Sequence, residues 1–307
     1  YTHKALALGQ DQIVTITKES IDVMSFEGEV VHPPEFTIDW DASAADKGGW
    51  SSFMAKEISE EPEAVANTLR GRLSPEGEVT IPELDSLDVS LIDRVIFIAC
   101  GTAAYAAMLG AYAMEKWSGI PVTVELSHEF RYRDPVVGAG TLVVSVSQSG
   151  ETMDTLMAVR YANELGAQTL AICNTQGATI PRESDATLYT HAGPEVAVAS
   201  TKAFLSQTIA VYLLGLYLGR HRAVVSAELA AQTAQDLHNL PDQIQEMVDT
   251  GPRIKELAGW MADTRSVLYL GRHVGYPVAL EGALKLKELA YIHAEGYAAG
   301  EMKHGPI

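Results

Sequence analysis

Cysteine is scarce in this sequence of 307 residues, and its two cysteines form no recognisable framework. Cys100 and Cys173 are too few for a disulfide scaffold and lack the CxxC spacing of a zinc site. Both lie in apolar, strand-like runs, so we interpret them as buried, reduced thiols of a cytoplasmic protein. A reactive nucleophile is the alternative interpretation.

Basic residues are also in short supply. The chain has 22 Lys and Arg against 40 Asp and Glu, which gives a formal net charge of −18. This charge opposes the phosphate attraction that dominates nucleic-acid affinity, so we expect neither a nucleic acid nor an anionic membrane surface as a partner. Any phosphate bound here must sit in a local pocket of backbone N–H and hydroxyl groups.

Several familiar signals are missing. The first residues show no basic and then apolar leader, so we expect no signal peptide. The most apolar stretch, residues 209–218, is much shorter than the ~20 residues that span a bilayer, and it predicts a buried helix. No G-x-G-x-x-G follows a strand-like run, and no His, Cys and Asp residues cluster at metal-ligand spacing. We therefore expect no cofactor and no metal.

The hydrophobic pattern divides the chain into segments. With 47% hydrophobic and 20% charged residues, the chain can bury a folded core, and its length suggests about two domains. Residues 1–36 alternate apolar and polar positions, which predicts antiparallel strands. Residues 37–85 begin with the Pro, Asp, Ser and Gly composition of a linker and continue into a helical stretch that Pro62 divides in two.

Continuous Val, Ile and Leu runs alternate with helical stretches over residues 86–226. Strands of this kind are covered on both faces, so we predict an α/β sandwich with a central parallel sheet flanked by helices. Residues 95–105 and 267–276 share one layout, an apolar strand, a Gly, a short polar loop and a helix. This indicates a second, truncated copy of the domain over residues 250–307; recurrence of a common strand–Gly–helix unit is the alternative.

A hydroxyl-rich loop, Ser-Gln-Ser-Gly-Glu-Thr at residues 147–152, follows one predicted strand and leads into a helix. Such a helix N-terminus offers unpaired N–H groups, a favourable dipole and O–H donors to an anion. The loop lacks the Lys of the P-loop, so it suits the fixed monophosphate of a sugar better than the transferred phosphate of a nucleotide. A simple helix cap by Ser149 or Thr152 is the alternative interpretation.

Two other segments can contribute to the same ligand site. Cys100, Gly101 and Thr102 follow another predicted strand, and ligands of open parallel sheets bind beyond the carboxyl ends of strands. The sequence Val-Ala-Ser-Thr-Lys at residues 198–202 opens a further helix, for which a cap by its Ser or Thr is the alternative.

Residues 280–306 carry the groups best suited to proton transfer. On a helix, Glu281, Lys285 and Glu288 occupy positions i, i+4 and i+7 and therefore share one face. Apolar neighbours partly bury that face, so a carboxylate beside the lysine can shuttle a proton between adjacent carbons of a sugar; solvated ion pairs are the alternative. His304 can exchange a proton near neutral pH and suits the opening of a cyclic sugar, with a plain surface histidine as the alternative.

Ten short motifs occur in one order from about residue 53 onward: FMAKEI, ACGT, SHEFRYR, SQSGET, AICN, PRESD, ASTKAF, ALEGALKLKE, YIHAE and GEMKHGP. Together they resemble the sugar isomerase (SIS) half of the glutamine–fructose-6-phosphate aminotransferase family, also called glucosamine-6-phosphate synthases. The resemblance implies an SIS-type three-layer sandwich in tandem, with the first copy at residues 86–226 and an incomplete second copy at 250–307. Residues 1–36 resemble the end of that family's glutaminase domain.

The resemblance also implies a function. The family converts fructose 6-phosphate and glutamine-derived ammonia into glucosamine 6-phosphate, the first step of hexosamine and UDP-N-acetylglucosamine synthesis. It needs neither metal nor cofactor, and we expect a cytoplasmic homodimer whose sugar ligands include glucose 6-phosphate. A sugar-phosphate sensor and a simple aldose–ketose isomerase remain as alternatives. The retained proton carriers favour the enzyme over the sensor.

The resemblance also implies roles for particular residues of this chain. Glu288 resembles the base that moves a proton between C1 and C2, Lys285 and Glu281 resemble its catalytic neighbours, and His304 resembles a ring-opening group that reaches the partner subunit. The predicted sugar-phosphate contacts are Cys100, Gly101, Thr102, Ser147, Gln148, Ser149, Thr152, Val198 and Ser200.

The sequence departs from the family pattern at two positions. Ala103 follows ACGT where many members have Ser, which removes one hydroxyl from the predicted phosphate loop. Glu61 replaces a common Gln in the stretch around Pro62. Neither departure removes a predicted proton-transfer group.

Overall fold

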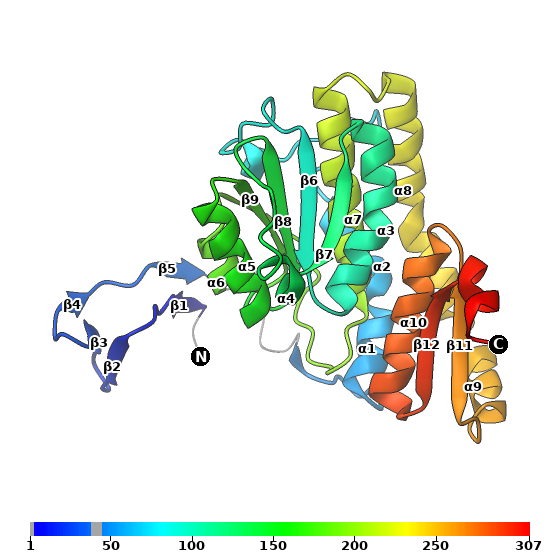
Figure 1. Cartoon of the computed structure of the whole chain (residues 1–307). Coiled ribbons are helices and arrows are strands. Elements are labelled where there is room, and N and C mark those ends of the chain that lie inside the picture. The colour runs from blue at the N-terminus through cyan, green and yellow to red at the C-terminus, as the bar shows by residue number, and fades with distance from the viewer. Residues whose placement is uncertain (1–2, 38–44) are drawn as a thin grey trace.

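The computed structural model describes residues 3–37 and 45–307 of the chain (Figure 1). The N-terminal part is a small all-β unit that projects from the body, as Figure 1 shows. Its strands are β1 (Lys4–Leu6), β2 (Gln12–Ile16), β3 (Ile21–Ser25), β4 (Val30–Val31) and β5 (Glu35–Thr37). All their pairings are antiparallel, which confirms the prediction from the alternating pattern. Part of the predicted linker, residues 38–44, lies outside the described residues.

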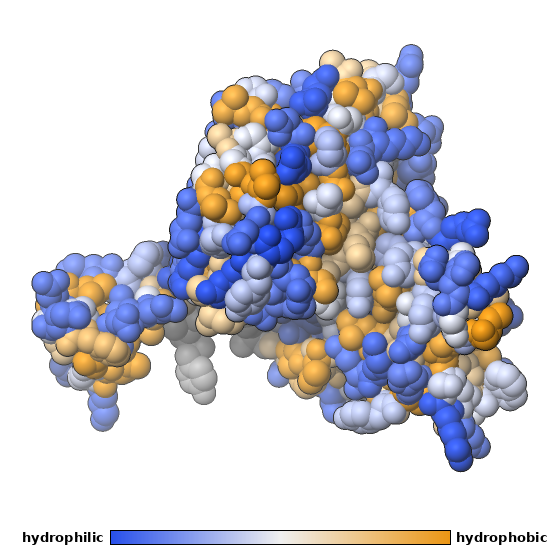
Figure 2. Space-filling view, viewed as in Figure 1, coloured by the Kyte–Doolittle hydropathy of each residue, from blue (hydrophilic) through white to orange (hydrophobic). Residues whose placement is uncertain are grey.

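Hydrophobic side chains remain exposed on the β2–β3–β4 sheet. Among them are Ile16, Phe26 and Val30, which are each more than half exposed. Figure 2 shows hydrophobic residues gathered on this projecting unit. A sheet of three short strands cannot bury both of its faces by itself, so these side chains stay in contact with solvent.

The predicted helical stretch after the linker is two helices, α1 (Phe53–Ser59) and α2 (Glu61–Leu69). Pro62 lies in the first turn of α2, where its missing N–H has no intrahelical partner to lose. This confirms the predicted division at Pro62.

A five-stranded, all-parallel sheet forms the centre of the molecule, as predicted. Its spatial order is β10-β9-β8-β6-β7, so the chain leaves β6 toward one edge and returns on the other side of it as β8. The carboxyl ends of β6 and β8 are therefore the point at which the strand order reverses, where α/β sheets open a crevice. The strands are β6 (Arg94–Ala99), β7 (Val122–Leu126), β8 (Thr141–Ser147), β9 (Gln168–Cys173) and β10 (Ala186–Tyr189).

Helices cover both faces of this sheet and complete three layers (Figure 1). Alternate residues of β6 divide between two cores: Phe97 packs with the helices of one face and Ile98 with those of the other. The first face carries α2, α3 (Thr102–Ser118), α7 (Lys202–His221) and α8 (Ala227–Val248). The second face carries α4 (Ser127–Phe130), α5 (Met153–Glu164) and α6 (Thr179–Arg182).

Helix α7 contains the most apolar stretch of the sequence. By length and composition it could cross a membrane, but 78% of the relevant window is buried inside the structure. It packs mainly against α3, and both helices contribute to the larger core. Helix α7 is thus a core helix of this fold, as the sequence predicts.

The chain ends in a β–α–β unit made of β11 (Ser266–Gly271), α10 (Gly275–Ala290) and β12 (His293–Ala298). The layout of residues 267–276 predicts one strand followed by one helix, and the structure corrects this by adding the strand β12. Strand β12 has no Val or Ile, and it forms by parallel pairing with β11 while Gly296 lies close to the backbone of α10. The preceding helix α9 (Gly251–Trp260) buries none of its residues, and the short helix η3 (Ala299–His304) follows β12.

Candidate active site

A pocket of about 220 Å³ opens where the strand order reverses, beyond the carboxyl ends of β6 and β8. The N-terminal ends of α3, α5 and α7 meet around it. None of its lining residues is Lys or Arg, so an anion inside it must be held by neutral donors and helix ends. The lining residues are Cys100, Thr102, Ala103, Val146, Ser147, Gln148, Ser149, Thr152, Ser200 and Gln207.

The loop between β8 and α5 is shaped by its own polar groups. The Ser147 hydroxyl oxygen accepts a hydrogen bond from the Gly150 N–H at 3.0 Å and lies 3.4 Å from the Thr152 hydroxyl. Gly150 has a φ of +68°, and a Cβ at this position would lie 2.6 Å from the Cβ of Ala178. The Thr152 side chain makes no capping hydrogen bond to α5, and among the described residues Ser149 bonds only to the N–H of Glu151. The simple-cap interpretation is therefore wrong for this loop.

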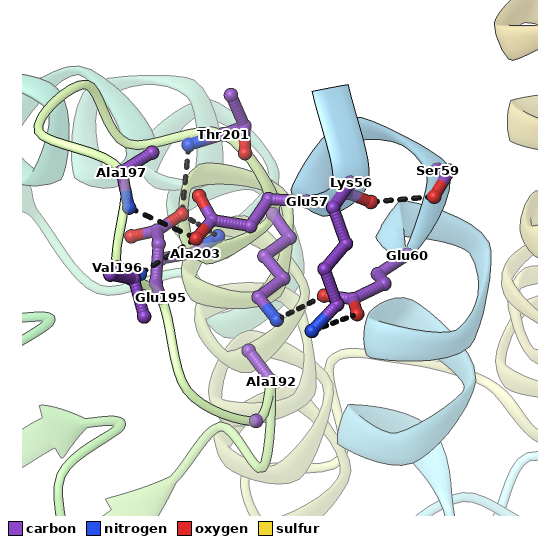
Figure 3. A network of polar contacts seen from close by, with 12 residues as sticks. Lys56, Glu57, Ser59, Glu60, Ala192, Glu195, Val196, Ala197, Thr201 and Ala203 are labelled. Carbon is purple, nitrogen blue, oxygen red and sulfur yellow. Dashed lines mark hydrogen bonds and ion pairs between the residues drawn. The ribbon is translucent and has the colours of Figure 1, made fainter. Parts of the chain in front are cut away.

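The loop before α7 is held by two carboxylates (Figure 3). Glu57, on α1, accepts hydrogen bonds from the N–H groups of Val196 and Ala197 at 2.6 and 3.0 Å. Glu195 accepts from the N–H of Thr201 at 2.8 Å and from that of Ala203 at 3.2 Å, so it caps α7.

The hydroxyl of Ser200 also donates to Glu195, at 3.0 Å. The Thr201 hydroxyl caps nothing and has no partner among the described residues. The interpretation of Ser200 or Thr201 as the cap is therefore wrong. The sequence reasoning missed Glu57 and Glu195, because no local spacing connects Glu57 to a loop 139 residues away.

Burial raises the pKa values of two carboxyl groups near the start of α7, those of Glu195 and Glu61. Burial raises the pKa of Glu195, although the hydrogen bonds from α7 oppose the shift. Burial, assisted by the nearby charge of Glu195, raises the pKa of Glu61 to about 7. The Lys202 ammonium lies 2.7 Å from Glu60 and 3% of its side chain is exposed, so Glu60 is paired with a buried cation.

The predicted acid–lysine face of α10 exists and contacts the pocket. Lys285 Nζ lies 2.7 Å from Glu288 and 3.4 Å from Glu281. Thr102, a pocket residue, donates its hydroxyl proton to Glu281 at 3.1 Å and accepts a hydrogen bond from Lys285 at 3.0 Å. Thr102 therefore joins the pocket directly to the helix that carries the predicted proton carriers.

The two glutamates of α10 lie in different environments. Glu281 is 8% exposed, and its Oε2 is buried without a hydrogen-bond partner among the described residues. Burial raises the pKa of Glu281, although Lys285 and the hydrogen bond from Thr102 oppose the shift. Glu288 is more accessible: 34% of its side chain is exposed, and it is paired with Lys285.

The structure brings most predicted contacts together. Seven of the nine predicted sugar-phosphate residues line the pocket: Cys100, Thr102, Ser147, Gln148, Ser149, Thr152 and Ser200.

Three predicted residues lie elsewhere. Gly101 turns the backbone into α3 with a φ of +55°, Val198 is 99% exposed outside the pocket lining, and His304 is exposed at the end of η3. The sequence reasoning missed Gln207, whose one signal is that it is a polar residue at the start of the apolar stretch of α7.

Metal-ligating residues do not converge in the described part of the chain. No group of three or more His, Cys, Asp or Glu side chains is placed to hold a metal ion among residues 3–37 and 45–307. The polar groups at the pocket are instead hydroxyls, amides and backbone N–H groups.

A parallel sheet that opens into a hydroxyl-lined pocket at its switch point defines an α/β domain that binds small molecules. Comparison with protein families is more specific. The SIS domain matches residues 90–217 and 261–307, which is over half of the chain. The chain belongs to the SIS domain family.

Two similar proteins carry the same name. The chain is 64% identical over 310 residues to the glutamine–fructose-6-phosphate aminotransferase [isomerizing] of Leifsonia xyli, and 56% identical over 309 residues to that of Corynebacterium glutamicum. Each alignment covers 100% of this chain and 50% of the relative, so the chain spans about half the length of these relatives.

A solved structure is similar over most of the chain. The C-terminal domain of glucosamine-fructose-6-phosphate aminotransferase from Francisella tularensis superposes with a TM-score of 0.81 at 39% identity. The match covers 85% of this chain and 73% of that one.

Proposed function

We propose that this chain is the sugar-phosphate half of an enzyme that makes glucosamine 6-phosphate from fructose 6-phosphate and glutamine-derived ammonia. The observation that carries the proposal is the double hydrogen bond of Thr102, which joins an anion pocket to a helix bearing two carboxylates and a lysine. A sugar held by its phosphate in the pocket therefore has proton carriers beside its other end. The names of the relatives support the same activity and do not favour a sensor or a simple isomerase.

The pocket anchors the phosphate. Its hydroxyls, the loop N–H groups and the converging helix ends donate to the phosphate oxygens without a basic side chain. Neutral donors also let the product leave, because no buried ion pair has to be broken on release. This anchoring fixes the distance between the phosphate and the reacting carbons, which lowers the entropic part of the barrier.

The helix α10 supplies the proton transfers. Ammonia adds to the C2 carbonyl of the open-chain ketose and water leaves, which gives an imine at C2. Glu288 then takes a proton from C1 while the imine nitrogen gains one, which gives an enaminol with a C1–C2 double bond. Glu288 returns its proton to C2 and the C1 hydroxyl gives up its proton, so that C1 becomes an aldehyde and C2 carries the amine. The net change is fructose 6-phosphate plus ammonia to glucosamine 6-phosphate plus water.

Exposure separates the roles of the two glutamates. Glu288 is accessible and paired with Lys285, which suits a base that must touch the substrate. Glu281 is buried and bonded to Thr102, so it positions Thr102 and Lys285 rather than reaching C1 itself.

The remaining parts of the chain fit a larger assembly. We assign β11–α10–β12 to the start of a second SIS domain at residues 250–307, after the first at 86–226, and β1–β5 to the end of a glutaminase domain at 1–36. Exposed apolar side chains on α9 and β11, such as Trp260 and Leu268, suit further packing there. The enzyme is a cytoplasmic homodimer in which His304 opens the sugar ring in the partner's site.

Activity of the full-length protein tests this function. We expect glucosamine 6-phosphate from fructose 6-phosphate with either glutamine or ammonium as donor. Glu288→Gln should bind glucose 6-phosphate as the wild type does and form no product. Glu164→Gln, at an exposed site on α5, is the matched control and should keep full activity. Lack of product from folded wild-type protein with both donors would refute the function, and equal loss of binding and turnover in Glu288→Gln would refute its role as the base.

A further inference from the structure

Gln207 lies on α7 at the wall of the candidate pocket and is almost completely buried. The residue is 2% exposed, and it lines the pocket together with Ser200 and Ala103. Its Oε1 is buried without a hydrogen-bond partner among the described residues, whereas its Nε2 is not one of these buried, unpartnered atoms. A buried amide oxygen that forms no hydrogen bond is costly, because it has lost its water without a replacement. The amide is therefore available to a molecule that enters the pocket.

Neighbouring residues show that this position is unusual. Thr208, next to Gln207 on α7, satisfies its hydroxyl by donating to the carbonyl of Phe204 at 2.9 Å. The Ser206 hydroxyl is also buried without a partner in the part of the chain that the structure describes, but Ser206 does not line the pocket. Gln207 alone among these residues combines an unused polar group with a place in the pocket wall.

The composition of the pocket indicates what the amide binds. The lining holds no Lys or Arg, and Ala103 offers only a methyl group at the start of α3. An anion in this pocket depends on neutral donors, and the amide of Gln supplies two N–H groups. Because Oε1 is the buried atom of this amide, the N–H groups of Nε2 are the ones that can face the pocket.

We infer that Gln207 is a further binding residue of this site and donates its side-chain N–H to the phosphate group of the bound sugar. The inference rests on the proposed function, because it requires a phosphorylated sugar in this pocket. The hydrogen bond from Gln207 to the phosphate is charge-assisted and buried, so its loss should weaken the binding of the sugar phosphate strongly.

Isothermal titration calorimetry of the full-length protein with glucose 6-phosphate tests the inference by measuring the Kd. Gln207→Met keeps the length of the side chain and removes its donors, and we expect the Kd to rise about 10- to 100-fold. Gln207→Glu places a carboxylate against the phosphate, and we expect a larger loss at pH 8. That loss should shrink relative to wild type as the pH falls to 5.5, because the introduced carboxyl becomes neutral. A purely structural role would not produce this pH dependence.

Ser206→Ala is the matched control, since it removes a buried, unpartnered hydroxyl from the same helix outside the pocket lining. Its Kd should equal that of the wild type. A folded Gln207→Met variant with wild-type affinity would overturn the inference while leaving the proposed function intact. Absence of glucose 6-phosphate binding to the wild type would instead refute the proposed function.

Discussion

Glu61 provides a sharp test of the electrostatics of this fold. It is the first residue of α2, where burial and the charge of Glu195 raise its pKa to about 7. In the unfolded chain this carboxyl has its ordinary value of 4.5. Since the folded-state pKa is the higher one, ionised Glu61 destabilises the folded protein. The penalty is small below pH 4.5, grows between pH 4.5 and 7, and is complete above pH 7.

The magnitude follows from the two pKa values. The step from 4.5 to about 7 corresponds to roughly 3 kcal/mol at high pH. Glu61 is only partly buried and gains some stabilisation at a helix N-terminus, so we reduce this to about 2 kcal/mol. The substitution Glu61→Gln removes the charge, and we expect it to stabilise the folded protein by that amount at pH 8.

Thermal unfolding of the two proteins at pH 5 and pH 8 measures the effect. We expect the Tm of Glu61→Gln to exceed that of the wild type by about 4–8 °C at pH 8, and by less than half as much at pH 5. Glu63→Gln removes the same charge from an exposed position of α2 and should leave the Tm nearly unchanged at both pH values. An equal gain at both pH values, or no gain at pH 8, would refute the reasoning.

Two further predictions test the pocket. Iodoacetamide should label Cys100, which lines the pocket and is only partly buried, not fully buried as the sequence predicts. Glucose 6-phosphate but not glucose should slow that reaction. Cys173 should stay unlabelled because burial raises its pKa to about 12, and peptide mass spectrometry that finds Cys173 labelled first would contradict this. Gly150→Ala should lower the unfolding free energy by about 2 kcal/mol and weaken glucose 6-phosphate binding, because the new Cβ meets Ala178 at a positive φ. Gly166→Ala, also at positive φ but with open space around it, should lose about half as much stability and keep its affinity.

Much of the fold is predictable because its strands carry their own signal. The central strands are runs of Val, Ile and Leu that are buried on both faces, and that pattern belongs to a parallel sheet. The sequence does not predict strand β12, because residues 293–298 have little β propensity of their own. It becomes a strand through its pairing with β11, which is information that residues 293–298 do not contain.

The candidate site also has features that the sequence predicts and features that only the folded chain shows. The spacing of Glu281, Lys285 and Glu288 correctly predicts a shared helix face. The bonds from Thr102 to that face cross at least 179 residues of sequence, so only the folded chain reveals them. A cap of α7 by Ser200 or Thr201, the alternative interpretation of that segment, follows from the frequency of Ser and Thr at helix N-termini and is wrong here, because Glu195 accepts from the first N–H groups of the helix from the preceding loop.

The hydrogen bonds from Glu57 to Val196 and Ala197 affect where this domain can be cut. The SIS match begins at residue 90, yet the segment that leads to the pocket residue Ser200 is tethered to a helix that begins at Phe53. A fragment trimmed to the family boundary would retain every residue that lines the cavity and lose the carboxylate that fixes the segment leading to Ser200. The smallest autonomous binding unit is therefore longer than its sequence signature, and expression boundaries belong upstream of α1.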